Sequence, residues 1–417
     1  MHRHTRREML PFLMTLARPA RAQGPAYDLI VKGGDVVDPS QNLRGVRDIA
    51  VEGSKIARIA PEIPAGQARV VIDARRKIVT PGLVDIHVHV YDGVAPLGIP
   101  ADPNCIAKGA TTVVDAGSAG ANTFPGFRRM VLPFAETRVF ALLNISLIGQ
   151  STVAEDHPWG ELLDLRHVNT KLAIQTIEKN RDVILGVKVR LSESIAGGND
   201  LRALEMTREV ADAVRLPLMV HIGGTVTPLT RLLTVLKSGD VITHSFHGRA
   251  QGILDAAGRV LPEVRKAVES GVRLDVGHGK GSFSWSVMES AYKQGITPGT
   301  ISSDVHQFNV AGPVFDLATT LSKFLHLGMS LEQVIERATA GPARAFRFPH
   351  SPGTLRPGAE ADIAVFEMRE GDFEMYGATA GDGKPPEMRI ANRRLVPVAT
   401  VKAGKLYGSA TIPVVRI

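Results

Sequence analysis

An alternating stretch, PGLVDIHVHV at residues 81–90, places one carboxylate and two imidazoles in a pattern that could bind a metal ion. In an extended strand, side chains at positions i, i+2 and i+4 point to the same side. Asp85, His87 and His89 therefore share one face, while the valine and isoleucine side chains occupy the other. Paired imidazoles can ligate a metal, but histidines in a strand also serve as hydrogen-bonded core residues. The rest of the chain decides between these interpretations.

Four further polar side chains stand at the ends of later apolar segments. Separately, each has an ordinary structural explanation, because a lysine after a strand often extends to solvent and an aspartate before a helix often caps it. Together, however, they are all ligand types at the ends of strand-like segments, which favours one shared metal site over unrelated structural roles. The predicted ligands are His87, His89, Lys188, His221, His244 and Asp304.

Side chains so far apart in the sequence can meet only if the strands that carry them run parallel and end at one edge. Between residues 80 and 349, eight strand-like segments alternate with helical periodicity, which is typical of an α/β fold, the (β/α)8 TIM barrel. The chemistry of such a barrel lies at the carboxyl ends of its strands. The predicted strands are LVDIHVHV, ATTVVDAG, RVFALLNISLIG, VILGVKVRL, LPLMVHIGG, DVITHSF, VRLDVGHG and TISSD. Predicted helices include LLDLRHVNTKLAIQTIEKN, LRALEMTREVADAVR and VLPEVRKAVES.

Both ends of the chain have a different texture, with short β segments separated by turn glycines. Residues 26–79 contain DLIVKGGDVVD, RDIAVEGSKIARIA and ARVVIDARRKIV, and residues 350–417 contain ADIAVFEM, RLVPVATVKAGKLYG and ATIPVVRI. Neither piece has enough strands to bury a core alone. We therefore expect the two pieces to form one composite β-sandwich domain beside the barrel.

Residues 1–22 have the features of an export signal. Arg6 and Arg7 lie in a stretch that resembles the twin-arginine motif, an apolar run follows at residues 9–17, and Ala20-Arg21-Ala22 resembles a cleavage site. This pattern predicts a twin-arginine signal peptide and a periplasmic protein. The alternative is a disordered basic tail on a cytoplasmic protein.

Composition excludes several classes of protein. Apolar residues make up 44% and charged residues 22% of the 417 residues, as in a soluble globular protein. The single cysteine, Cys105, excludes an internal disulfide framework and a cysteine zinc cluster. Much of the net charge of +7 falls within residues 1–22, and no basic run is interleaved with aromatics, so a nucleic-acid partner is not expected. No apolar run is long enough to predict a membrane span.

The set of motifs resembles a known superfamily. PGLVDIHVH, a lysine in the fourth strand, histidines at the fifth and sixth and an aspartate at the eighth are similar to the amidohydrolase superfamily in its binuclear, carboxylated-lysine form. The stretches VVDAGSAGANTFPGF, GVKVR, HSFHG and DVGHGKGSFSW resemble its dihydroorotase-related deacetylase branch, which hydrolyses acetyl esters or N-acyl amino acids. The resemblance covers nearly everything after residue 22, including the split β domain.

This resemblance implies two divalent metal ions, and imidazole and carboxylate donors suit Zn²⁺. Lys188 would react with CO2 to form N6-carboxylysine, an anion that bridges the ions, whereas an ordinary ammonium would repel them. A hydroxide shared by the ions would attack the scissile carbonyl, and Asp304 would take its proton and return it to the leaving group. The implied division places His87, His89 and Asp304 at one ion, His221 and His244 at the other, and Lys188 at both.

Substrate contacts are harder to predict from the sequence. Arg190 shares the face of Lys188 and could hold a substrate carboxylate, although a structural ion pair would explain it equally well. His278 follows the seventh strand on a glycine-rich loop that could approach a ligand. Other polar residues near strand ends could donate to a carboxylate or an oxyanion. The predicted substrate contacts are Arg190, His278, Tyr91, Asn144 and His247.

The predicted function is that of a metal-dependent deacetylase, esterase or amidase, which cleaves an acyl ester or amide of a small carboxylate-bearing compound. A dihydroorotase-like cyclic amidase is the alternative, but that family usually has an arginine soon after the His-x-His motif, where this chain has Val90-Tyr91-Asp92-Gly93. A deaminase would usually lack the lysine of the fourth strand. A non-catalytic barrel scaffold would have lost ligands that this chain retains. Members of the superfamily are often oligomeric, and the resemblance extends this expectation to a homo-oligomer.

Overall fold

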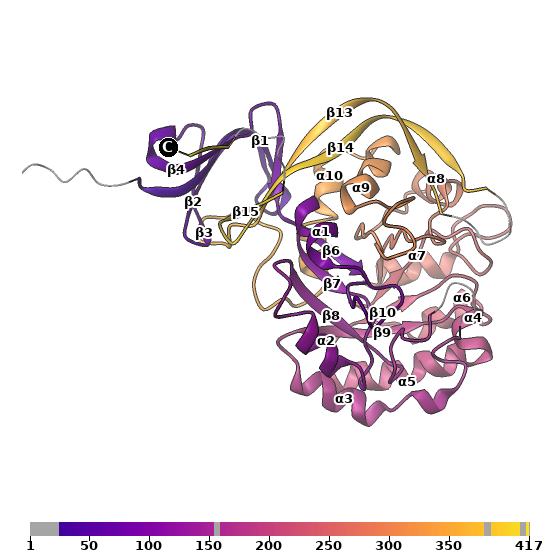
Figure 1. The fold of residues 1–417 in the computed structure, drawn as a ribbon. Coiled ribbons are helices and arrows are strands. Elements are labelled where there is room, and N and C mark those ends of the chain that lie inside the picture. Colours follow the sequence, from indigo (N-terminus) through magenta and orange to yellow (C-terminus); the bar gives the residue numbers. More distant parts are fainter. Residues whose placement is uncertain (1–24, 154–158, 379–384, 409–413, 417) are drawn as a thin grey trace, which may run out of the picture.

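Two sheets organise the molecule, one in the barrel and one formed by both ends of the chain (Figure 1). The computed structural model describes residues 25–153, 159–378, 385–408 and 414–416. The predicted signal peptide, residues 1–22, lies outside the described residues. In this arrangement the predicted fold class, a parallel α/β barrel with a β domain from both chain ends, is confirmed.

The barrel sheet contains seven parallel strands in sequential order. Residues 300–304, predicted as the eighth strand, form no regular ladder, and the barrel closes there through isolated bridges, one joining Asp275 to Thr300 and one joining Val88 to Val305. Side chains replace part of the missing ladder, because Ser303 donates its amide and hydroxyl to the Asp85 carboxylate. The strands are β6 (Leu83–Val88), β7 (Ala110–Asp115), β8 (Arg138–Asn144), β9 (Ile184–Arg190), β10 (Leu218–His221), β11 (Val241–Thr243) and β12 (Arg273–Leu274).

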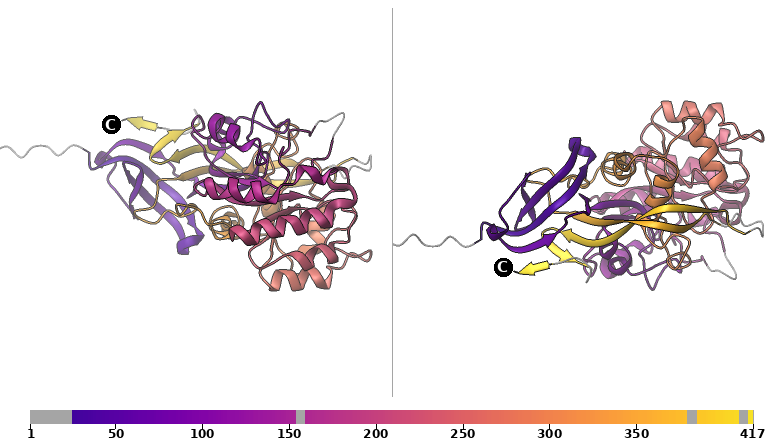
Figure 2. Two further views of the ribbon diagram at one scale, coloured as in Figure 1. Left: turned by 90° about the horizontal axis from the view of Figure 1, so that it is seen from below. Right: turned by 90° about the horizontal axis from the view of Figure 1, so that it is seen from above.

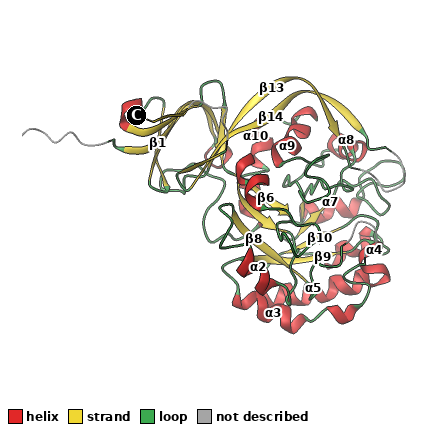
Figure 3. Ribbon diagram, in the orientation of Figure 1, coloured by secondary structure: helices red, strands yellow, loops and turns green. Residues whose placement is uncertain are grey.

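Helices α3 and α5 lie along the outer side of the strands (Figure 3). The helix predicted from residue 162 begins only at Thr170, because the Asn169 side chain accepts the Leu172 amide and caps the helix there. No helix among the described residues is long and apolar enough to cross a membrane. The helices are α1 (Ala101–Asn104), α2 (Phe124–Met130), α3 (Thr170–Lys179), α4 (Glu193–Ala196), α5 (Asp200–Val214), α6 (Leu229–Leu232), α7 (Pro262–Glu269), α8 (Trp285–Lys293), α9 (Leu317–His326), α10 (Leu331–Glu336) and α11 (Ala340–Ala345).

The second sheet is mixed, has nine strands and joins the two ends of the chain where β13 pairs antiparallel with β5. Buried Val36, Val79 and Ile363, from both ends, pack in one apolar cluster. Figure 2 shows the sheet beside the barrel. Its strands are β1 (Tyr27–Asp38), β2 (Leu43–Glu52), β3 (Lys55–Ala60), β4 (Ala68–Asp73), β5 (Ile78–Pro81), β13 (Ile363–Tyr376), β14 (Met388–Lys402), β15 (Lys405–Tyr407) and β16 (Val414–Arg416).

Strands β13 and β14 form a long hairpin that leaves the β domain and crosses over the barrel helices (Figure 1). The Leu395 amide donates to the Ser322 hydroxyl of α9 at 2.9 Å. Farther along the hairpin, the Trp285 indole of α8 donates to the Met375 carbonyl at 2.8 Å. The hairpin therefore ties the β domain to the last helices of the barrel.

An apolar cluster, which we call the barrel floor, lies directly beside the predicted site. Strands β6 to β11 all contribute, and Phe346 packs with them from the segment after α11. Met219 belongs to the floor, and its Sδ lies 3.4 Å from Lys188 Nζ. The floor comprises Val84, Ile86, Val114, Ala116, Phe140, Leu142, Leu185, Met219, Val241, Ala345 and Phe346.

Candidate metal centre

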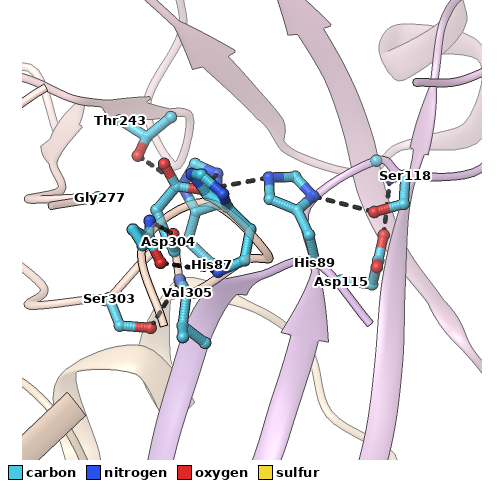
Figure 4. Close-up of polar contacts among 12 residues, drawn as sticks. His87, His89, Asp115, Ser118, Thr243, Gly277, Ser303, Asp304 and Val305 are labelled. Carbon is cyan, nitrogen blue, oxygen red and sulfur yellow. Dashed lines mark hydrogen bonds and ion pairs between the residues drawn. The ribbon is translucent and has the colours of Figure 1, made fainter. Parts of the chain in front are cut away.

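His87, His89 and Asp304 meet at the carboxyl end of the barrel (Figure 4). One Asp304 oxygen, Oδ1, lies 3.3 Å from His87 Nε2 and 3.1 Å from His89 Nε2. The three side chains are buried, and each offers a ligand atom within 4.8 Å of the others. Two imidazole nitrogens and a carboxylate at this spacing form a metal site of the N,O type that suits zinc and related divalent ions.

In His87 and His89, the ring nitrogen that faces away from Asp304 is hydrogen-bonded to a hydroxyl group. His87 Nδ1 lies 2.8 Å from Thr243 Oγ1, and His89 Nδ1 lies 2.9 Å from Ser118 Oγ. Burial lowers the pKa of both rings, that of His89 to about 3 and that of His87 well below its usual range. At neutral pH both rings are therefore uncharged, which is the state that binds a metal.

His221 and His244 form a second pair, with ring centroids 4.2 Å apart. His244 Nδ1 donates to the Gly277 carbonyl at 2.6 Å, which leaves Nε2 as the nitrogen with a free lone pair. His221 is held at its other nitrogen, because Nε2 lies 3.0 Å from Ser192 Oγ, whose hydrogen goes to the Gly223 carbonyl. The Ser192 oxygen must then accept from His221, so Nδ1 is the ring nitrogen with a free lone pair.

Lys188 lies between the two histidine pairs and is fully buried. Its Nζ is 3.3 Å from His87 Nε2 and 3.4 Å from the Met219 sulfur of the floor. Burial lowers the pKa of this amine to about 7, with Asp304 opposing the shift and Arg190 adding to it. The four predicted histidines, Lys188 and Asp304 all line one cavity of about 210 Å³.

Two of the predicted ligands have a backbone conformation that non-glycine residues rarely adopt. The φ angles are 62° at His244 and 50° at Asp304, both in the left-handed region. The neighbouring loop approaches so closely that it requires glycine, because a Cβ at Gly279 would lie 2.3 Å from Asp304 Oδ2. A Cβ at Gly277 would lie 2.2 Å from Thr243 Oγ1. The glycine-rich loop predicted to approach a ligand thus packs against the metal-binding side chains themselves.

Arg190 lines the same cavity, but it also has a protein partner. Its guanidinium lies 3.3 Å from a carboxylate oxygen of Glu161, which is fully buried. Both functions considered for this arginine, substrate contact and structural ion pair, are therefore compatible with its position. The ion pair uses one nitrogen, Nη1, and the guanidinium has further donors.

The other predicted substrate contacts are not among the residues that line the cavity. Tyr91 donates its hydroxyl to the Thr123 carbonyl at 2.8 Å, and Asn144 donates to the Gly117 carbonyl at 3.1 Å. These bonds use both side chains to fix loops next to the site. Their proposed contacts with substrate stay predictions.

His278 and His247 are buried outside the cavity lining as well. His278 Nε2 lies 2.7 Å from the buried amine of Lys323. His247 Nδ1 accepts the Arg249 amide at 3.1 Å. Direct substrate contact by either histidine also stays a prediction, since neither lines the cavity in this conformation.

One histidine near a strand end lines the cavity, whereas two hydroxyl groups that support the metal-site histidines were not predicted from the sequence. His306 lines the cavity, and its Nδ1 accepts the Phe308 amide at 3.2 Å, so the proton of the neutral ring is on Nε2. The hydroxyls of Ser118 and Thr243 contact the histidines, and only the folded loops bring them there. His306 follows Asp304 by two residues and is one of the polar residues near strand ends that could donate to a carboxylate or an oxyanion.

A sequence model of the amidohydrolase family matches residues 78–407. The chain belongs to the amidohydrolase family. A deacetylase of Enterococcus faecalis is 34% identical over 384 residues, which cover 91% of this chain and 99% of the relative. Among solved structures, this amidohydrolase is similar to an adenine deaminase, with 32% identity, a TM-score of 0.82 and coverage of 92% of this chain and 100% of the other. It is also similar to a dihydroorotase, with 30% identity, a TM-score of 0.81 and coverage of 92% and 99%.

Proposed function

We propose that this amidohydrolase is a deacetylase, esterase or amidase that cleaves an acyl ester or amide of a small carboxylate-bearing compound. The observation that carries the proposal is one cavity, about 210 Å³ in volume, lined by all the predicted ligands and by Arg190. This volume is below the range of roughly 300–1,000 Å³ that is usual for drug-sized ligands, which favours a small substrate. The deacetylase relative supports the reaction class.

The proposal includes two divalent ions. Neutral imidazoles and a carboxylate form a donor set that fits zinc, and the outward nitrogen of every histidine is already occupied by a hydrogen bond. Each neutral ring is therefore in the tautomer that leaves its other nitrogen unprotonated and able to bind a metal. One ion would be held by His87, His89 and Asp304 and the other by His221 and His244.

Lys188 would join the two ions as N6-carboxylysine. An amine with a pKa of about 7 is largely uncharged slightly above neutral pH, and in that form it can attack CO2. The product is an anion with two oxygens, which removes the repulsion that an ammonium would exert on two cations. Its position beside His87 supports this bridging role.

Asp304 would act as the proton carrier of the reaction. Bound divalent ions would supply Lewis acidity, lowering the pKa of water from 15.7 to roughly 7 and polarising the scissile carbonyl. The Asp304 carboxylate accepts the proton of the attacking water and then returns it to the leaving group. Cys105 is not a candidate nucleophile, because it is buried and burial raises the pKa of its thiol.

Arg190 would hold the substrate carboxylate at the wall of the cavity. Its guanidinium retains donors beyond those that contact Glu161, and a carboxylate can accept two of them in parallel. Arg249 and Lys280 also line the cavity, so its charge favours an anionic compound. A neutral acyl ester should be a poorer substrate than its carboxylate-bearing counterpart.

Dihydroorotase activity is the second candidate, since a dihydroorotase structure is similar over almost its whole length. A substrate screen separates the candidates. Zinc-reconstituted protein would be offered acetylated 2-hydroxy acids, N-acyl D- and L-amino acids, dihydroorotate and adenine, with Asp304→Asn as the control. We expect turnover of an acetyl ester or N-acyl compound that the control lacks. Turnover of dihydroorotate or adenine alone would contradict the proposal, as would undiminished activity in the control.

Export through the twin-arginine route is a separate part of the proposal, supported by Arg6-Arg7 and the apolar run that follows. A reporter fused after residue 30 should reach the periplasm only when both arginines are intact. Export of the Arg6→Lys/Arg7→Lys version by the same route would contradict this part and leave the catalytic proposal untouched.

A further inference from the structure

A buried carboxylate stands behind His87, separated from it by one hydroxyl. Asp275 is fully buried and accepts hydrogen bonds of 2.7 Å from the hydroxyls of Thr243, Thr300 and Ser302. Because the single Thr243 hydroxyl hydrogen goes to Asp275, the Thr243 oxygen must accept the Nδ1–H of His87. The order carboxylate, hydroxyl, imidazole directs the lone pair of His87 Nε2 toward the metal site.

His89 has the same arrangement on the other side of the site (Figure 4). Its Nδ1 lies 2.9 Å from Ser118 Oγ, and the Ser118 hydroxyl lies beside the buried Asp115 carboxylate, where it opposes the rise that burial causes in the pKa of that group. Asp115 is held in turn by the amides of Val90 and Ser118, at 2.9 and 2.7 Å. Val90 directly follows His89, so the same carboxylate fixes both the ring and the backbone of this ligand.

The histidines of the second pair are supported by neutral groups instead. His244 donates to the Gly277 carbonyl, and His221 is held by Ser192, whose hydrogen goes to the Gly223 carbonyl. No carboxylate is bonded to these acceptors in the described contacts. Loss of a group that accepts the N–H of a metal-binding histidine typically costs about 10–100-fold in metal affinity. A negative charge behind that group should strengthen the support beyond that of a neutral carbonyl, because hydrogen bonds to ionised groups are stronger.

We propose that Asp275–Thr243–His87 and Asp115–Ser118–His89 are two carboxylate–hydroxyl–histidine relays that make the His87–His89–Asp304 position the tighter of two metal positions. Thr243 and Ser118 are positioning residues, which set the tautomer of each ligand and add negative charge behind it. The inference rests on the proposed two-ion site. It predicts ordered binding, with the first ion at His87, His89 and Asp304.

Zinc titration of the chelator-treated full chain tests the relays. We expect wild type to bind two ions with different affinities, and the tighter affinity to fall about 10–100-fold in Thr243→Val. Thr243→Ser retains the hydroxyl and should bind within a few-fold of wild type. Thr300→Val is the matched control, since it removes a hydrogen bond to the same Asp275 carboxylate without touching a histidine. Ser118→Ala provides an independent variant if the valine substitution prevents folding.

Nitrogen-15 spectra of the metal-free protein give a readout separate from metal affinity. Wild type should show His87 and His89 protonated at Nδ1, and Thr243→Val should shift His87 alone toward the other tautomer. Unchanged tighter affinity in both Thr243→Val and Ser118→Ala, with folding intact, would overturn the relays. If wild type binds one ion that Thr243→Val weakens, the relays stand and the two-ion function fails.

Discussion

The two ends of the barrel strands differ in chemistry although the same strands form both. The floor consists of apolar side chains from β6 to β11, whereas the carboxyl ends carry the histidines, Lys188 and Asp304. The two regions touch where Met219 meets the Lys188 amine. The floor thus has a chemical effect as well as a structural one, because the burial it contributes is the main cause of the lowered pKa of Lys188.

The largest effect is expected at the carboxyl ends. Asp304→Asn removes a carboxylate of the metal site, which is also the proposed proton carrier, while keeping the size of the side chain. We expect kcat to fall by about 10²–10⁴-fold with the melting temperature nearly unchanged. Steady-state kinetics and thermal unfolding of the same preparation check this. A variant that keeps wild-type kcat would show that Asp304 is not the proton carrier.

Lys188→Ala should abolish the proposed bridge between the two metal ions. We expect loss of bound zinc and of activity, with partial recovery when a short carboxylic acid is added, since its two oxygens can replace those of the carbamate. Metal content and activity with and without propionate provide the measurement. Full turnover by the variant without added acid would show that no bridge at this position is needed.

In the floor we expect a substitution to lower stability while metal binding and activity are retained. Leu142→Ala leaves a cavity in a site that is 1% exposed, and we expect it to lower the free energy of unfolding by about 2–5 kcal/mol. Zinc stoichiometry and kcat should remain within a few-fold of wild type, as measured after denaturant unfolding curves establish the folded fraction. Loss of metal in a fully folded Leu142→Ala protein would show that the two regions are not separable.

The smallest predicted effect is a dependence of stability on pH. Burial lowers the pKa of His247 to about 4, whereas an unfolded histidine titrates near 6.5. Below pH 6.5 the unfolded chain therefore binds more protons than the folded chain, and stability falls as the pH falls. Between pH 7 and 5 this group should account for about 2 kcal/mol of the loss in metal-free protein. The loss should be smaller by that amount in His247→Asn, whereas an equal loss in both proteins would contradict it.

The sequence was sufficient for the parts of the fold that depend on local pattern. Alternation and apolar runs predicted β6 through β11, because a barrel strand needs apolar residues on the side that meets the helices. Residues 300–304 were predicted as a full strand but contribute only isolated bridges, and there the side chains of Ser302 and Ser303 bond the carboxylates of Asp275 and Asp85. The apolar pattern of the sequence does not reveal these side-chain bonds or the irregular pairing of the segment.

In the site, too, some features were predictable from the sequence and others were not. Ligand types at strand ends were readable because parallel strands fix which ends meet. The contacts of Thr243 and Ser118 could not be predicted from the sequence. Each hydroxyl reaches its imidazole only because tertiary folding brings together segments that are far apart in the chain. His278 was predicted near the substrate, but its loop turns the ring toward Lys323, outside the cavity lining. Loop conformation depends on contacts that residue spacing does not encode.

Anomalous diffraction from crystals of the zinc-reconstituted protein tests the metal centre most directly. We predict a zinc peak about 2.0–2.1 Å from His87 Nε2 and His89 Nε2 and about 2.0–2.2 Å from an Asp304 oxygen. Saturating zinc that leaves no peak between these three side chains would contradict the account.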